Sequence, residues 1–487
     1  MSKARIFILF LFCSLQALAQ PGGTAGFRYE AKDSVVTVIS DQYGDKSFLH
    51  RLVMGKNYRK TWSTPVKLPV FRLSHTNLTI QELGGGEQTK SLQLVDAEGK
   101  EWALRTIDKD VTLAVPPRLR NTVAQKIVQD MISAAHPFSH VIVGHLSKAA
   151  GIKASMPVIY FVADDPALKE YRNIFANTVC MLETKEPLPV GDIDETEEVI
   201  ARTTEKNSHL VMQEKVLKSR LMDMLVGDWD RHEGQWTWSE KDSAGTRWFH
   251  VIPKDRDNAL FYSNGLLPKI TQLFFMPHLS GFKKKSSGLK KLNAKALEFD
   301  RQFLNSLDRE EWTRAIINMQ QQLTDSVIEA SVRAIPEPVY RLDGDELVEK
   351  LKSRRDGLLQ NGLEYYAQLS RNITINGSDE NEIFTAQGDG KNVKILVSRI
   401  SSDGSRQTIF ERTINPSETR SVSLVGFAGD DRFEIEASAK APLRLHIFGN
   451  EGNDHYSVKG SLKTKIIDGN LAKNITADQH AAKLGGQ

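Results

Sequence analysis

The chain has 487 residues, of which 40% are hydrophobic and 26% are charged, and its formal net charge is +3. This length is too great for one hydrophobic core, so we expect two or three domains. The composition is that of an ordinary globular protein, which excludes a disordered or collagen-like chain. The small net charge gives no reason to expect a nucleic-acid partner.

The first residues have the pattern of a secretory signal peptide. Lys3 and Arg5 precede a largely apolar run that ends in Ala-Leu-Ala at positions 17–19, a small-residue pattern that suits cleavage. We therefore expect residues 1–19 to be removed and the mature chain to be periplasmic or secreted. No later run reaches about 18 consecutive apolar residues, so we expect no transmembrane segment after cleavage. Cys180 is then the only cysteine, which excludes an intramolecular disulfide.

The pattern of predicted secondary structure changes twice along the mature chain. Residues 20–75 mix short β-type runs with turns, and we interpret them as an N-terminal extension. Residues 76–371 alternate predicted strands with predicted helices. Residues 372–475 contain short β-type runs separated by Gly, Asn and Asp, which is typical of a small all-β domain. The chain is therefore predicted to be α+β.

The middle region begins with a predicted hairpin. A glycine-rich loop at residues 83–90 precedes alternating apolar residues on either side of a Glu-Gly turn. Residues 119–135 carry apolar residues at helical spacing, and residues 156–162 have the composition of a buried strand. A further helix is predicted over residues 211–226, with Gly227 at its C-terminal cap.

Two long helices are predicted before the last region. The first begins at Asp308, where Glu311 completes a capping-box pattern, and runs towards Val332. The second spans about Glu346 to Leu369. No Gly or Pro interrupts the first, and Pro336 stops it.

The last region contains an internal repeat. LVGFAGDDRF at 424–433 matches IFGNEGNDHY at 447–456 with an offset of 23 residues, which predicts stacked strands with identical turns. The Gly-x-x-Gly-x-Asp turn resembles part of a calcium-binding repeat, in which Asp oxygens bind Ca²⁺. The alternative is that these aspartates cap tight turns.

Polar residues with a possible chemical role follow the helix at 211–226. Asp230 and Gln235 lie five residues apart, and an apolar strand then leads to Asp255 and Asp257. Phosphoryl transfer needs one carboxylate to orient or deprotonate the acceptor hydroxyl, and further oxygens to hold magnesium on the nucleotide. Aspartates at a helix end also act as caps and turn formers, which is the alternative interpretation.

The segments 228–238 and 248–257 resemble the active-site region of the atypical kinases of the CotH spore-coat family. The Asp-Arg-His pattern is similar also to that of HipA-type kinases. The resemblance implies a bilobal, atypical kinase-like domain over residues 76–371 that uses ATP with Mg or Mn. It places Asp230 on the catalytic aspartate, and it places the metal ligands on Gln235, Asp255 and Asp257.

The resemblance extends to the parts that bind phosphates. The loop at residues 84–90 resembles the Gly-x-Gln-x-Lys loop of HipA-type kinases, whose backbone N–H groups and lysine would cradle phosphates. Arg105 stands where the family has a lysine for the α- and β-phosphates, with Lys109 beyond it, and Gln235 stands where the family has asparagine. Asp130 is the expected carboxylate partner of the cation at position 105. The residues to which the resemblance gives nucleotide contacts are Gly84, Gly85, Gly86, Lys90, Arg105 and Asp130.

A second resemblance spans most of the chain. Tyr-Arg-Lys-x-Trp at 58–62, the glycine loop, the Asp-Trp-Asp-Arg-His loop, Pro-Lys-Asp-Arg-Asp and the Gly-Asp-Asp repeat occur in this order. The order resembles the central region of certain Gram-negative envelope proteins, which join a periplasmic metallophosphoesterase-like domain to an outer-membrane barrel. It implies an outer-membrane or other envelope protein as partner.

Other functions share these residues. A catalytically inactive kinase-like domain would bind a nucleotide or a partner as an envelope scaffold, which suits a periplasm that contains little ATP. Metal-dependent glycosyltransferases also use Asp-x-Asp, but no Rossmann-like βαβ run precedes either copy here. Metallophosphoesterases need Gly-Asp-x-x-Asp, and the second Asp comes one residue early. The basic run at 283–285 with 290–291 is a solvated face, or alternatively a surface attracted to anionic lipid headgroups.

Overall fold

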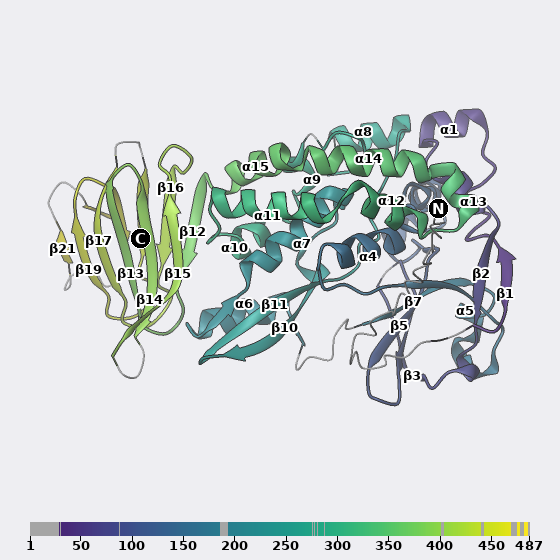
Figure 1. The fold of residues 1–487 in the computed structure, drawn as a ribbon, viewed down its shortest axis with the longest axis horizontal. Helices are drawn as coiled ribbons and strands as arrows, with labels where there is room; N and C mark the ends of the chain where they lie inside the picture. Colours follow the sequence, from purple (N-terminus) through teal and green to yellow (C-terminus); the bar gives the residue numbers. More distant parts are fainter. Residues whose placement is uncertain are drawn as a thin grey trace, which may run out of the picture.

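The computed structural model describes residue 29, residues 31–468 with gaps, and residues 475–477 and 482–485; the gaps are 87, 186–192, 275, 277, 280, 287, 401–403 and 440–442. The predicted signal peptide lies outside the described residues. The described residues up to 371 form a mixed part with sheets and helices. Those from 372 onwards form an all-β part at the other end of the molecule (Figure 1). No helix among the described residues is long and apolar enough to cross a membrane.

A seven-stranded sheet forms one end of the mixed part, with the strand order β1-β2-β6-β7-β5-β4-β3. Strand β2 pairs with β6 in parallel and all other neighbours pair antiparallel. The sheet has an apolar core separate from the helical core, and Leu92, Leu104 and Cys180 are fully buried in it. The strands are β1 (Ser34–Thr37), β2 (Val66–Phe71), β3 (Thr79–Gly84), β4 (Ser91–Val95), β5 (Glu101–Thr106), β6 (Val158–Val162) and β7 (Val179–Thr184).

The predicted N-terminal extension, residues 20–75, is not a separate unit where it is described. Its strand β2 buries alternate apolar residues and pairs with β6, so it completes the large sheet. The helices α1 (Phe48–Met54) and α2 (Arg59–Ser63) follow β1. Trp62 of α2 is 1% exposed and lies in the main helical core. The segment folds inward because its apolar residues supply the buried face of that sheet.

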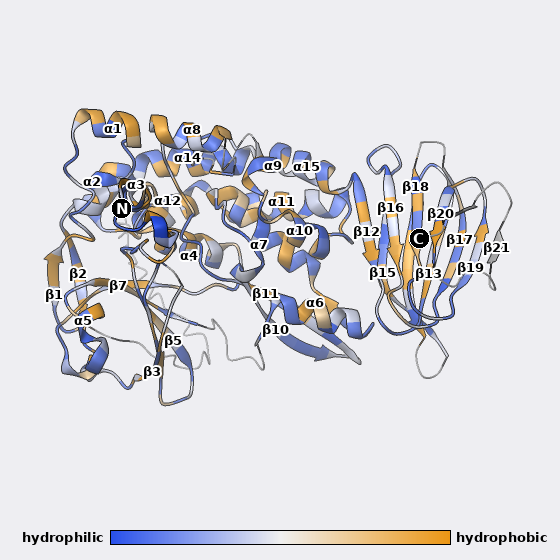
Figure 2. Ribbon diagram, turned by 180° about the vertical axis from the view of Figure 1, so that it is seen from behind, coloured by the Kyte–Doolittle hydropathy of each residue, from blue (hydrophilic) through white to orange (hydrophobic). Residues whose placement is uncertain are grey.

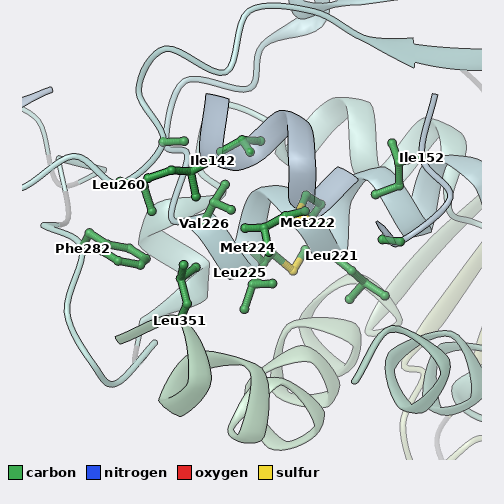
Figure 3. Close-up of a cluster of buried hydrophobic side chains, with 14 of the residues drawn as sticks. Ile142, Ile152, Leu221, Met222, Met224, Leu225, Val226, Leu260, Phe282 and Leu351 are labelled. Carbon is green, nitrogen blue, oxygen red and sulfur yellow. The ribbon is translucent and has the colours of Figure 1, made fainter. Parts of the chain in front are cut away.

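The helical core is built around α7 (Gln213–Val226), which has buried residues on all sides. Figure 3 shows its Leu221, Met222 and Leu225 packed among side chains of other elements. The other helices are α3 (Val123–Met131), α4 (Ser139–Ala149), α5 (Arg172–Phe175), α6 (Thr196–Glu205), α8 (Leu266–Phe274), α9 (Leu289–Leu292), α10 (Leu297–Phe303), α11 (Arg309–Gln322), α12 (Asp325–Arg333), α13 (Glu337–Val339), α14 (Asp345–Asp356) and α15 (Leu358–Leu369).

Each of the two long predicted helices is divided into two. The capping box of Asp308 and Glu311 begins α11 as predicted, but the helix ends at Gln322. The hydroxyl of Thr324 then accepts a hydrogen bond from the backbone N–H of Val327 and caps a new helix, α12. In the second case the break falls at Gly357, between α14 and α15.

A small four-stranded sheet positions the polar loops, with the order β8-β10-β11-β9. The hairpin of β10 and β11 pairs Trp236 with Pro253, so the residue before β10 and the residue after β11 are neighbours. The backbone N–H of Lys254 donates to the carbonyl of Gln235 at 3.0 Å. The strands are β8 (Ile193–Glu195), β9 (His209–Val211), β10 (Trp236–Ser243) and β11 (Thr246–Pro253).

From residue 372 onwards the described elements are strands, arranged in two sheets. One has the order β12-β16-β18-β20-β22 with parallel neighbours, and the other has the order β15-β14-β13-β17-β19-β21. The strands are β12 (Asn372–Asn376), β13 (Glu382–Gly390), β14 (Val393–Ile400), β15 (Arg406–Ile414), β16 (Ser421–Val425), β17 (Arg432–Ala439), β18 (Arg444–Phe448), β19 (His455–Lys459), β20 (Lys463–Ile467), β21 (Ile475–Ala477) and β22 (Ala482–Gly485).

The 23-residue repeat corresponds to one rung of this stack, which we define as one strand in each sheet. The rings of Phe433 and Tyr456 lie stacked at 5.2 Å, and they occupy equivalent positions in two rungs. The backbone N–H of Asp431 donates to Asp454 Oδ1 at 2.9 Å, from one rung to the next. Gly452 has φ +117, and an added Cβ would lie 1.7 Å from the carbonyl oxygen of Gly429, so this turn requires glycine.

The aspartates of the repeat therefore cap the turns of neighbouring rungs. Asp431 Oδ1 accepts from the backbone N–H of Glu382, in the rung before it, at 2.8 Å. Among the described residues no group of three or more His, Cys, Asp or Glu side chains is arranged to hold a metal ion. The expected calcium role of this repeat therefore has no preformed ligand set in that part of the chain.

Candidate active site

The candidate site lies where α7 and the β10–β11 hairpin meet. Gly227 adopts a left-handed conformation with φ +71 and ends α7, so the chain turns away from the helix axis. The loop 228–235 then returns into β10, and β11 delivers residues 254–258 beside it. The hairpin register thus brings together two polar segments that are about twenty residues apart in the sequence.

Arg231 ties these two segments together. Its Nη1 donates to the carbonyls of Lys254 at 2.7 Å and of Asp255 at 3.3 Å, and its Nη2 donates to the carbonyl of Gln235 at 3.2 Å. The guanidinium also lies 4.2 Å from the ring centroid of Trp236. Because one planar group satisfies three carbonyls, Arg231 fixes the spacing between the loop and the segment after β11.

A fully buried carboxylate, that of Asp223, accepts a hydrogen bond from Arg231. Asp223 of α7 accepts hydrogen bonds from Arg220 at 2.8 Å, from Arg231 at 3.2 Å and from Arg256 at 2.7 Å. Burial alone would raise the pKa of Asp223, but the guanidinium groups, Arg231 foremost, keep that pKa below its usual value. Asp223 therefore stays ionised and neutralises the arginines around it.

The predicted catalytic residue, Asp230, lies in a chain of alternating charges and amides. Its Oδ1 forms an ion pair with Lys295 Nζ at 2.5 Å, and its Oδ2 lies 3.4 Å from Asn258 Nδ2. The same amide donates to Asp257 Oδ1 at 2.7 Å, and Asp257 also pairs with Lys109. Asp230 and Asp257 are thus linked through one bridging side chain.

The two aspartates after β11 have opposite pKa shifts. Burial raises the pKa of Asp255, and the neighbouring Asp257 carboxylate raises it further. Burial would also raise the pKa of Asp257, but Lys109, His140 and Arg105 together outweigh burial and lower it. Asp255 has φ +48, a left-handed conformation that is uncommon for a residue with a side chain. Such strain is typical of residues whose position is constrained by function.

The glycine-rich loop approaches the same place with only some of its predicted residues. Gly85 has φ +112, and an added Cβ would lie 2.2 Å from the carbonyl oxygen of Thr89, so no other residue fits without rearrangement. Gly86 has open space around its Cβ position, and both glycines line the cavity described below. Gly84 instead ends β3 beside Gln93, and Lys90 is not among the residues that line the cavity.

The expected pairing of Arg105 with Asp130 is not made. Arg105 Nε lies 3.3 Å from Glu183 Oε1 on the neighbouring strand β7. Asp130 instead accepts a hydrogen bond from Arg59 Nη1 at 2.7 Å, and Arg59 belongs to the segment that was predicted to be an extension. The extension folds against α3 and takes this carboxylate, which corrects the partner assigned to Asp130. Among the described residues Lys109, four positions after Arg105, forms an ion pair with Asp257.

One cavity joins these elements. It has a volume of about 820 Å³ and lies between the glycine loop, the loop after α7, the segment after β11, α3 and α8. Its polar wall contains Lys109 and Asn258 besides the predicted residues, and its apolar wall is formed by α3 and α8. Of the predicted residues it is lined by Gly85, Gly86, Arg105, Asp230, Gln235, Asp255 and Asp257.

Several residues of the site were missed by sequence reasoning. Asn258 directly follows the Asp-x-Asp, and its adjacency was the one available signal. Asp223 stands out as a charged residue within the apolar run of α7, which is a signal for a buried ion pair. Lys295 is 65 residues from Asp230, and nothing in the local sequence marks their contact.

Asp228 gives a prediction for the pH dependence of stability. Burial raises the pKa of its carboxyl to about 7 from 3.8, although the Arg231 guanidinium opposes the shift. Between about pH 4 and pH 7 the folded chain keeps this proton and the unfolded chain releases it, so raising the pH in this window favours unfolding. We expect Asp228→Asn, which removes the titration, to gain stability relative to the wild type from about pH 4.5 to 7.5.

Urea denaturation of both proteins at each pH measures this difference. The amide oxygen of asparagine can still accept the hydrogen bond that Asp228 Oδ1 accepts from the backbone N–H of Asp230 at 3.0 Å. Parallel pH profiles of the two proteins would contradict a protonated Asp228 in the folded chain.

No family model matches the chain, and no curated protein matches it. Among solved structures, the Helicobacter pylori proinflammatory kinase CtkA is similar with 12% identity and a TM-score of 0.34, over 61% of this chain and 99% of that chain.

Two further solved structures are similar at the same level. The Rio2 kinase of Chaetomium thermophilum, in a complex with ADP, Mg²⁺ and phosphoaspartate, has 10% identity and a TM-score of 0.28, over 58% of this chain and 71% of that chain. HipA of Shewanella oneidensis has 10% identity and a TM-score of 0.31, over 59% and 67%. All three TM-scores are below 0.5.

Proposed function

We propose that the chain is a kinase-like phosphotransferase that uses a nucleoside triphosphate and a divalent cation. The observation that supports this most is the cavity of about 820 Å³, which brings Gly85 and Gly86 into one space with Asp230, Asp255 and Asp257. Phosphoryl transfer requires backbone donors for phosphates, carboxylates for a cation and one carboxylate for the acceptor hydroxyl. All three occur around this cavity.

The donor set fits a hard divalent cation. Mg²⁺ is usually held by one or two carboxylates together with the phosphates of the substrate, rather than by a full protein cage. Asp255 and Asp257 are two such carboxylates, and the raised pKa of Asp255 reflects its burial and then the repulsion between the two. A cation held by Asp255, Asp257 and Gln235 would relieve this repulsion and neutralise charge on the phosphates.

The other residues of the chain would bind and orient the reactants. The carboxylate of Asp230 would accept the proton of the acceptor hydroxyl, or orient that hydroxyl towards the phosphate. Lys109 would exchange its contact with Asp257 for a phosphate oxygen when the nucleotide binds. Asn258 would keep Asp230 and Asp257 at a fixed separation, because its amide contacts both carboxylates.

The second candidate is a nucleotide- or partner-binding scaffold without turnover. Two observations favour it: Lys295 pairs with Asp230, and Lys109 pairs with Asp257. Each lysine forms an ion pair with a carboxylate that phosphoryl transfer would need. In this case nucleotide binding would persist, and replacing Lys295 would not reveal turnover.

We expect Lys109→Met to weaken metal-dependent ATP binding by about tenfold or more, because a charge-assisted hydrogen bond to phosphate is lost. Titration calorimetry with ATP and Mg²⁺ or Mn²⁺ measures the change. Lys352→Met is the matched control, because Lys352 pairs with Asp325 and Glu329 on the helical surface. No binding by the wild type at millimolar ATP with either metal would refute both candidates that use a nucleotide.

We further propose that the mature chain acts in the periplasm or outside the cell, beside an outer-membrane or other envelope protein. The support for this is the signal-peptide pattern of residues 1–19 and the resemblance in motif order to envelope proteins.

A further inference from the structure

Helices α1 and α8 form one exposed surface, and α3 adjoins it. The backbones of Gly55, after α1, and Gly265, before α8, approach so closely that a Cβ on Gly265 would lie 2.4 Å from the nitrogen of Gly55. The backbone N–H of Lys56 also donates to Asn264 Oδ1 at 2.8 Å. Both helices lie along the same edge of the molecule (Figures 1 and 2). We call the outer side of α1, α3 and α8 the three-helix face.

Large apolar side chains are exposed on this face. On α1, Phe48 is 75% exposed and Leu49 is 67% exposed; on α8, Leu273 is 73% and Phe274 is 75% exposed. Figure 2 shows α1 as a largely hydrophobic helix beside α8. Single exposed apolar residues are common, whereas a cluster on neighbouring helices indicates an interaction surface. Val123 of α3 is also exposed, at 71%.

The three segments that build this face contain one acidic residue, Asp130 near the end of α3. No Asp or Glu occurs at 46–81, 111–129 or 258–297. Asp130 is buried and accepts a hydrogen bond from Arg59 Nη1. The whole chain has 64 basic and 61 acidic residues, so this scarcity is local. The third segment contains seven lysines, which are Lys269, Lys283, Lys284, Lys285, Lys290, Lys291 and Lys295.

We propose that the three-helix face binds an anionic lipid membrane surface. Exposed phenylalanine and leucine side chains would enter the boundary between headgroups and acyl chains, while lysines and arginines around them would contact lipid phosphates. A second copy of the chain is a poorer occupant, because a symmetric contact would place this basic face against itself. The combination of an exposed apolar centre with neighbouring lysine-rich sequence is complementary to a negatively charged bilayer.

The cavity lies on the inner side of two of these helices. Leu267 and Thr271 of α8 and Ile127 and Met131 of α3 line it, while Leu273 and Phe274 of α8 point their exposed surface outwards. Membrane contact through this face would therefore place the cavity close to the bilayer surface. The proposal stands on exposed residues and charge, and it does not depend on nucleotide binding or turnover.

Co-sedimentation with lipid vesicles, without nucleotide or metal, tests the proposal. We expect the wild type to bind vesicles of phosphatidylcholine with phosphatidylglycerol, to bind pure phosphatidylcholine vesicles at least about tenfold more weakly, and to lose affinity as salt is raised. The double variant Leu273→Asp with Phe274→Asp should bind at least about tenfold more weakly than the wild type. Val36→Asp is the matched control, because Val36 is exposed on β1, outside the face.

The thermal unfolding of each variant shows whether it is folded. A folded double variant that binds anionic vesicles as well as the wild type would overturn the proposal, as would a wild type that binds neither kind of vesicle. A wild type that binds no vesicles but is dimeric by light scattering, with a monomeric double variant, would assign the face to contacts between copies and would also overturn it.

Discussion

Asp223→Asn is expected to lower the free energy of unfolding by about 3–5 kcal/mol, because it removes one partner of a buried ion-pair network. Asp223, Arg220 and Arg231 are all fully buried, and Arg256 is 6% exposed. Without the carboxylate, three guanidinium groups lose an anionic partner inside the helical core. Chemical denaturation followed by tryptophan fluorescence measures the loss.

A control on the surface separates this effect from the loss of any ion pair. Asp242 of β10 pairs with Arg247 of β11 at 3.0 Å near the end of the hairpin, so Asp242→Asn should leave the denaturation midpoint unchanged. Because Arg231 holds the carbonyls of Lys254 and Asp255, Asp223→Asn should also weaken nucleotide binding in the protein that remains folded. A stability close to that of the wild type would show that the arginines find other anionic partners.

Asp230→Asn is expected to lower the turnover of phosphoryl transfer by about 10²–10⁴-fold, which is the range for removing a general base. The isosteric amide keeps the contact with Asn258 but loses the charge that pairs with Lys295. Nucleotide binding should be retained, because the loss concerns the acceptor. Single-turnover assays with labelled ATP, combined with calorimetry on the same variant, separate the two effects.

A carboxylate on the surface is the matched control for this experiment. Asp164 pairs with Arg172 outside the cavity, so Asp164→Asn should keep both turnover and binding. Equal turnover by Asp230→Asn and the wild type would remove Asp230 from the proposed mechanism. A wild type that binds nucleotide but shows no turnover with any acceptor, including itself, would favour the scaffold.

The sequence was informative where local rules determine the structure. Gly227 ends α7 in the left-handed conformation that its position predicted, and the capping box begins α11 at Asp308. The strand before Asp255 was predicted from its apolar run, and hairpin pairing then places Asp255 beside the loop of Asp230. These features depend on neighbours within a few residues or on one hairpin.

Contacts between distant segments could not be predicted in this way. Asp130 was expected to pair with Arg105, yet it pairs with Arg59, because β2 and α2 join the fold instead of extending from it. Likewise Lys295 reaches Asp230 only after the helices that follow β11 have packed. No periodicity or motif spacing contains this information, because it arises from tertiary packing.

The stacked turns of the C-terminal part restrict how its size can vary. Asp430 and Asn453 are joined by a hydrogen bond across 23 residues, as are Asp431 and Asp454, so each turn is matched to its equivalent in the next rung. An extra residue inside a strand would exchange its inward and outward side chains and break this match. The stack can therefore lengthen or shorten only by whole rungs, in steps of about 4.8 Å. The height of the β part therefore changes only in discrete steps, at the end of the molecule that is opposite the seven-stranded sheet (Figure 1).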